Sequence, residues 1–213
     1  EKELREYYSY VYRLIVEESD VSSVMSSYNR VNEVPQNLNN YTLDTLLRQT
    51  FGFDGYVTSD CDSVGIAQAG NGYDRDPLNP GGNGHGWRLP ETGEKITGPQ
   101  TVAWAINAGG DLQCNNGYAN RNTVYSTTIP TAVAEGITTP SGIFDENSVD
   151  VSLLRLLTAR MALGEFDVED GVVSWYNQAR ERIAENYGED WVYDLTNGGR
   201  DNGIDTITQE RKI

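Results

Sequence analysis

The stretch GFDGYVTSD, residues 52–60, decides the fold that this chain is expected to adopt. Its aromatic and β-branched residues, 56–58, favour a strand, and glycines at 52 and 55 mark the entry to it. The strand delivers Asp60 to its C-terminal end, which is where a β/α barrel places its chemistry. Asp60 is therefore a candidate nucleophile. A helix N-cap or a turn acid is the alternative reading of the same position.

Helices and strands alternate around this stretch. Apolar residues at a helical period predict a helix over 2–19, and a buried strand is expected over 22–28. A second helix is predicted over about 42–50, with Thr42 as its N-cap, and leads into the strand at 55–60. Helix, strand, helix and strand with short connections are typical of parallel β/α units.

A third unit follows further along the chain. The pattern predicts a helix over 99–108, ended by Gly109 and Gly110, and a short strand over 111–114. A long helix is predicted over 149–163, opened by Asp145 or Asn147.

The segments between these elements are expected to be irregular. Residues 70–100 are rich in glycine and proline and follow the strand that bears Asp60, so we interpret them as a loop that covers the site. Residues 115–148 are expected to be a second loop region. A helical segment over 175–187 is followed by a tail with little apolar content.

The charge and the rare residue types exclude several functions. The formal charge is −16, with 32 acids against 16 bases and no cluster of Lys and Arg, which disfavours nucleic-acid binding. The sequence contains no run of 18 apolar residues, so no membrane span is predicted. The only histidine, His85, is far in sequence from Cys61 and Cys114, so no metal site is expected and no cofactor is implied.

The expected fold is α/β and incomplete. Three strands cannot close a barrel, which needs about eight strands. Hydrophobic residues make up 38% of the chain, below the average of roughly 45–50%, so the core is expected to be modest. We therefore predict a partial (β/α)8 barrel of the TIM type, the last three or so units, over residues 1–167. A helical or irregular tail over 168–213 would lead toward a second domain.

Five motifs, in order, resemble glycoside hydrolase family 3. The similarity covers about residues 4–167. The matching pieces are SVMSSYN at 23–29 with Asn32 and Pro35, LLR at 46–48, GFDGYVTSD at 52–60, AGGDLQC at 108–114 and RMALGEFD at 160–167.

The resemblance implies a role for specific residues. In that family the aspartate that ends the GFDGYVTSD-like strand is the nucleophile, here Asp60. Retaining glycosidases pair such a carboxylate with a second carboxyl group roughly 5–5.5 Å away, which protonates the leaving oxygen. By the same resemblance Tyr28 and Met25 line the sugar pocket, although both could instead be core residues. Asp62 and Asp111 are interpreted as structural acids.

Cys61 distinguishes this chain from many family members, which carry Trp directly after the nucleophile. The SDCDS and DLQC forms resemble the β-xylosidase and α-arabinofuranosidase branch, and a Cys here implies a narrower pocket for a pentose. On the resemblance, Cys61 and Cys114 follow adjacent strands, so a disulfide that lines the pocket is one expectation. Two separate buried thiols are the other.

The expected function is a retaining, exo-acting, β-xylosidase-like hydrolase whose partner is a small oligosaccharide or glycoside. The family's earlier sugar-binding motifs would lie before residue 1 and its acid/base glutamate after residue 213. We therefore expect this piece to be inactive alone and to need the remaining parts of the same enzyme. A β-glucosidase, or a catalytically dead sugar-binding or scaffold fragment, are the rivals.

Overall fold

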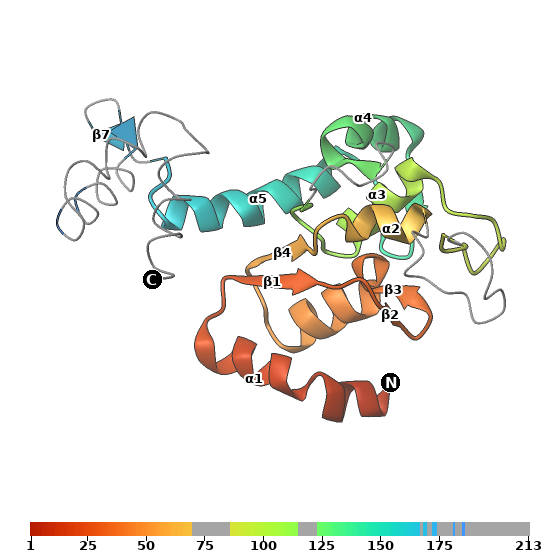
Figure 1. The fold of residues 1–213 in the computed structure, drawn as a ribbon, viewed down its shortest axis with the longest axis horizontal. Helices are drawn as coiled ribbons and strands as arrows, with labels where there is room; N and C mark the ends of the chain where they lie inside the picture. The colour runs from red at the N-terminus through yellow and green to blue at the C-terminus, as the bar shows by residue number, and fades with distance from the viewer. Residues whose placement is uncertain are drawn as a thin grey trace, which may run out of the picture. The chain divides into compact units, whose positions relative to one another are not determined.

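The computed structural model divides into two compact units, Glu1–Ala159 and Arg160–Ile213 (Figure 1). It describes residues 1–69, 86–114 and 123–166, the short strands β7 (Val168–Glu169) and β8 (Val172–Val173), and the single positions 181 and 185. Most of the predicted site-covering loop and of the predicted helix over 175–187 lies outside the described residues, as does His85.

Parallel strands form the centre of the first unit. Strand β1 (Ser23–Ser26) pairs in parallel with β4 (Tyr56–Ser59), as the alternating pattern predicts. Thr58 of β4 also forms a parallel bridge to Leu112. This single bridge is all that the structure has of the strand predicted over 111–114. Strand β4 thus lies between two neighbours that run in its own direction. The C-terminal ends of all three segments meet at one edge.

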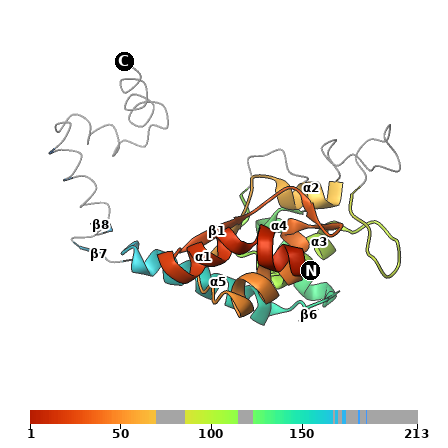
Figure 2. The same cartoon turned by 90° about the horizontal axis from the view of Figure 1, so that it is seen from below.

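Helices at the N-terminal side build the first core cluster. The predicted helix over 2–19 is present as η1 (Leu4–Tyr8) and α1 (Tyr10–Ser19), interrupted at Ser9. The predicted helix over 42–50 is η3 (Tyr41–Thr50). Figure 2 shows the same elements from below. The cluster joins η3 to β4 and contains Leu43, Leu46, Leu47, Phe51, Phe53, Val57 and Ala108.

The N-terminal cap of η3 differs from the prediction. The side chain of Asn39 accepts a hydrogen bond from the Thr42 amide at 3.2 Å, and the Thr42 hydroxyl donates to the Asn39 carbonyl oxygen at 3.1 Å. The Asn39 side chain thus binds an amide of the first turn, which is the function expected of Thr42.

A second cluster joins short helices that follow β3 and β4 to the helix that begins at Gly98. The hairpin of β2 (Arg30–Val31) and β3 (Val34–Pro35) leads into the short helix η2 (Gln36–Leu38). Leu38 packs with residues of α2 (Ser63–Ala69) and α3 (Gly98–Asn107). Helix α3 begins at a capping box, in which Thr97 and Gln100 each bind the other's backbone amide.

Trp87, which lies in the predicted loop over 70–100, is buried. Its side chain belongs to the second cluster and is 5% exposed. It meets the Trp104 ring edge-on, with ring centroids 5.1 Å apart. Burial of so large an aromatic surface stabilises this position more than the polar loop composition suggests.

The predicted loop over 115–148 is wrong in its second half. Residues 125–135 form helix α4 (Tyr125–Glu135), and the hairpin of β5 (Thr138–Thr139) and β6 (Gly142–Ile143) follows it. Threonines and Pro130 obscure α4 in the sequence because they are poor helix formers. Packing of Ala132 against Val102 and Ile106 of α3 overrides that propensity.

The long helix predicted over 149–163 is α5 (Glu146–Ala162). Asp145 caps it, because its carboxylate accepts a hydrogen bond from the Ser148 amide at 3.0 Å. In the second unit, Gly164 adopts a left-handed φ of 72° just after the helix ends.

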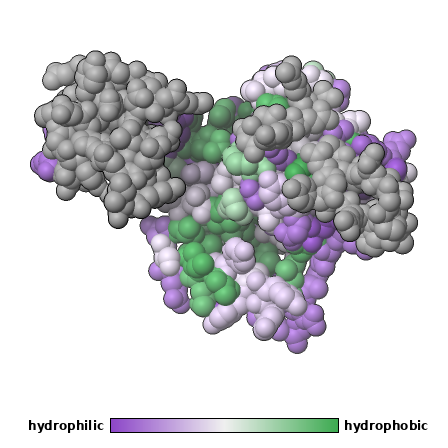
Figure 3. Space-filling model, in the orientation of Figure 1, coloured by the Kyte–Doolittle hydropathy of each residue, from purple (hydrophilic) through white to green (hydrophobic). Residues whose placement is uncertain are grey.

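Large apolar side chains remain on the surface of the described residues. Apolar surface is visible over the lower part of the molecule in Figure 3, where Figure 1 places α1. Within the described ranges no helix is long and apolar enough to cross a membrane, and no group of three potential metal ligands occurs. Side chains at least 55% exposed are Tyr7, Tyr8, Val11, Tyr12, Met25, Ile143, Leu154, Met161 and Leu163.

Candidate active site

Asp60 lies at the end of β4, on the edge where the parallel strands finish. Its backbone amide donates to the Ser26 carbonyl oxygen at 2.9 Å, which continues the pairing with β1. One carboxylate oxygen, Oδ1, accepts a hydrogen bond from the Cys61 amide at 2.7 Å. The other, Oδ2, accepts none from the residues that the structure describes. The side chain therefore binds an amide that precedes α2 and leaves one oxygen for another partner.

Tyr28 and Met25 come from β1 and the turn that follows it. The Tyr28 hydroxyl donates to the carbonyl oxygen of Cys61, so it binds the residue next to Asp60. The Met25 side chain is 58% exposed and lies opposite Thr58 in the register. Neither is a core residue, since Tyr28 is also 43% exposed.

Cys61 and Cys114 form a disulfide, with their Cα atoms 4.4 Å apart. The backbone supports the same junction, because the Asp62 amide donates to the Cys114 carbonyl oxygen at 2.8 Å. The Cys114 amide in turn donates to Ser59 Oγ at 3.0 Å. The end of β4 and the turn after it are thus attached to the segment after Leu112 by one covalent bond and two hydrogen bonds.

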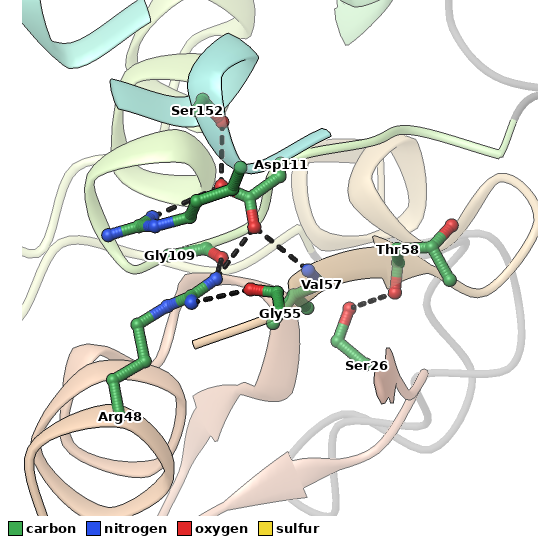
Figure 4. A network of polar contacts seen from close by, with 9 residues as sticks. Ser26, Arg48, Gly55, Val57, Thr58, Gly109, Asp111 and Ser152 are labelled. Carbon is green, nitrogen blue, oxygen red and sulfur yellow. Dashed lines mark hydrogen bonds and ion pairs between the residues drawn. The ribbon is translucent and has the colours of Figure 1, made fainter. Parts of the chain in front are cut away.

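Asp111 is structural, as the sequence indicates, and its partners come from three segments (Figure 4). Its Oδ2 accepts from Arg48 Nη2 at 2.6 Å and from the Val57 amide at 2.8 Å. Its Oδ1 accepts from Ser152 Oγ at 2.9 Å and from Arg155 Nη1 at 3.1 Å. The carboxylate side chain is fully buried, so these bonds fix the start of β4 against α5 and η3.

Arg48 extends this network to the backbone. It donates to the Gly55 carbonyl oxygen at 2.8 Å and to that of Gly109 at 3.1 Å. Burial lowers the pKa of Arg48 from its usual value, while the Asp111 charge opposes that change. Burial, with the same carboxylate, raises the pKa of Tyr125.

A second group of buried polar residues was not found by sequence reasoning. Asn37 of η2 accepts hydrogen bonds from Ser26 at the end of β1 and from Ser63 at the start of α2. Serine and asparagine in loops are common, so their residue types alone carry no signal. Their near-complete burial, 2–3% exposed, is visible only in the fold.

The comparisons with known proteins agree on one family. Residues 1–76 match the model described as "Glycosyl hydrolase family 3 N terminal domain". The chain is 40% identical over 120 residues to a probable exo-1,4-beta-xylosidase of Aspergillus fumigatus, which covers 55% of this chain and 12% of the relative. It is 33% identical over 169 residues to an exo-1,4-beta-xylosidase of Aspergillus awamori, covering 78% and 17%. The chain thus spans less than a fifth of the length of these curated relatives.

Solved structures show the same relationship. A GH3 exo-beta-xylosidase in complex with a xylobiose aziridine activity-based probe is 26% identical, with a TM-score of 0.50 over 86% of this chain and 21% of the other. A beta-glucosidase from Listeria innocua has a TM-score of 0.56 and 22% identity over 84% and 20%, a likeness in fold. Over residues 1–76 by the family model, and over most of the chain by the xylosidase structure, this chain is similar to members of glycosyl hydrolase family 3.

Proposed function

We propose that this chain carries the nucleophile of a retaining, exo-acting, β-xylosidase-like glycoside hydrolase. Asp60 Oδ2 attacks the anomeric carbon of a terminal, non-reducing sugar and forms a glycosyl ester as the bond to the leaving oxygen breaks. A second carboxyl group gives that oxygen its proton. The same group then takes a proton from the water that cleaves the ester.

The position of Asp60 carries this proposal. Asp60 ends the middle one of three parallel segments, and its Oδ2 accepts no hydrogen bond from the described residues. A β/α barrel carries its functional groups at this end of its strands. The hydrogen bond from the Cys61 amide occupies Oδ1, so Oδ2 is the oxygen left to attack a sugar.

We assign substrate contacts to Met25, Tyr28 and Cys61. Met25 and Tyr28 are exposed at the same edge as Asp60, where a sugar could reach them. The disulfide of Cys61 offers a smaller surface than an indole ring would, which suits a pentose without a hydroxymethyl group.

We further propose that residues 1–167 are part of a (β/α)8 barrel and that residues 168–213 lead away from it. Parallel sheets in proteins are covered on both faces, whereas Met25 on β1 is 58% exposed. A retaining mechanism also needs a proton donor, and the sequence assigns none to this chain. We therefore expect no turnover from the 213 residues alone and a need for the remaining parts of the same enzyme.

Covalent trapping tests the assignment. The complete enzyme, in which this chain is joined to its remaining parts, is incubated with a 2-deoxy-2-fluoro-xyloside that has a good leaving group, digested, and mapped by mass spectrometry. We expect a fluoroxylosyl ester on Asp60, loss of it in Asp60→Asn, and retention in Asp54→Asn, a matched change of an exposed acid in the same stretch. A label on another residue defeats the assignment of Asp60.

Parallel measurements separate the rivals. Faster labelling by the 2-fluoro-glucoside than by the xyloside favours a β-glucosidase. Saturable binding of xylobiose without any label favours a sugar-binding or scaffold role, and absence of both contradicts a sugar site in this chain.

A further inference from the structure

We propose that Asn37 is a positioning residue, which holds the Asp60 carboxylate in its orientation through Ser26 and Ser63. This inference rests on the role proposed for Asp60. Asn37 does not contact Asp60 itself. It joins the two segments that bind the Asp60 backbone on either side.

The first link passes through β1. The Ser26 hydroxyl donates to Asn37 Oδ1, and the carbonyl oxygen of Ser26 accepts the amide of Asp60 at 2.9 Å. The end of β1 is therefore bound to Asn37 by its side chain and to Asp60 by its backbone.

The second link passes through the first residue of α2. The Ser63 hydroxyl donates to the Asp60 carbonyl oxygen at 2.7 Å and lies 3.2 Å from Asn37 Oδ1, a second acceptor for the same proton. The Ser63 amide also donates to that Asp60 carbonyl oxygen, at 3.1 Å. Both backbone polar groups of Asp60 are thus bound by serines that meet at one asparagine oxygen.

Asn37 is itself held rigidly. Its Nδ2 donates to the Ser27 carbonyl oxygen at 3.0 Å, and its neighbour Leu38 is 1% exposed in the second core cluster. Asn37, Ser26 and Ser63 are 3%, 3% and 2% exposed, so water does not replace these bonds easily. Fixing the backbone of Asp60 fixes the direction of its Cα–Cβ bond. The Cys61 amide, which is bound to Oδ1, reports whether the carboxylate keeps its place.

Amide hydrogen exchange on the 213-residue chain tests the proposal. In Asn37→Ala we expect the Cys61 amide to exchange about tenfold faster, the scale of one lost hydrogen bond. The Leu112 amide, which binds the Val57 carbonyl oxygen, should keep its wild-type rate. Asn40→Ala, a matched change of an asparagine that binds Ser141 instead, should alter neither rate.

A second variant keeps the test decisive if Asn37→Ala does not fold. Ser63→Ala removes only the hydroxyl between Asn37 and Asp60 and should give the same selective change at Cys61. An equal acceleration at Cys61 and Leu112 means general loss of stability and overturns the proposal, as does no change at Cys61. Because exchange needs no sugar, its result is independent of the trapping test, and a failure to label Asp60 would count against the nucleophile alone.

Discussion

Replacing Asp111 by alanine should destabilise the first unit more than any other single change of a charged group described above. The carboxylate is fully buried and accepts four hydrogen bonds, two of them from arginines. Arg155 is 27% exposed and can turn toward water, whereas the side chain of Arg48 is 8% exposed and would keep an unpaired charge. Breaking a buried ion pair by removing one partner costs about 3–5 kcal/mol.

Urea unfolding measures this cost. At a slope of about 2 kcal/mol per molar urea, the expected loss lowers the midpoint by about 2 M. Glu6→Gln is the matched control, since it breaks an ion pair with Lys2 on the surface. The Glu6 side chain is 67% exposed and that of Lys2 is 83% exposed. The control should change the free energy of unfolding by no more than about 0.5 kcal/mol.

A double variant identifies the cause. If the orphaned charge of Arg48 dominates, Asp111→Ala combined with Arg48→Met should lose less stability than the sum of the two single changes. Additive losses, or a single-variant midpoint equal to that of Glu6→Gln, would refute the reasoning that Asp111 anchors the start of β4.

Three further predictions concern other parts of the first unit. Burial and the Asp111 charge raise the pKa of Tyr125, so the folded state keeps a proton that the unfolded state loses above about pH 10. The free energy of unfolding should therefore fall above that pH, and it should fall less steeply in Tyr125→Phe. Urea midpoints measured between about pH 9 and 11 check this. Replacing both Cys61 and Cys114 by serine opens a link between residues 53 apart and should lower the free energy of unfolding by about 4 kcal/mol; a loss below about 1 kcal/mol would contradict it. In Gly55→Ala the added Cβ would lie 2.2 Å from a backbone carbonyl oxygen, so we expect a loss of about 3 kcal/mol and a lower melting temperature, and an unchanged melt would show that the strand entry adapts.

The local spacing of apolar residues was sufficient to predict the helices and strands in which that spacing is regular. The helical period around Leu43, Leu46 and Leu47 and the β-branched run before Asp60 predict η3 and β4 because apolar spacing reflects which face is buried. Helix α4 was missed for the converse reason. Its threonines and Pro130 disfavour a helix locally, and only contact with α3 stabilises it.

The sequence by itself determined that an acid ends a strand and that helices and strands alternate around it, because that information lies in the order of residues along the chain. Only the tertiary structure decided that Cys61 joins Cys114, that Trp87 is buried, and that Asn37 binds two serines beside Asp60. These contacts join segments far apart in the chain, and which of many similar polar residues meet depends on how the strands and helices pack. Burial then strengthens the hydrogen bonds of serine and asparagine side chains, which their residue types alone do not reveal.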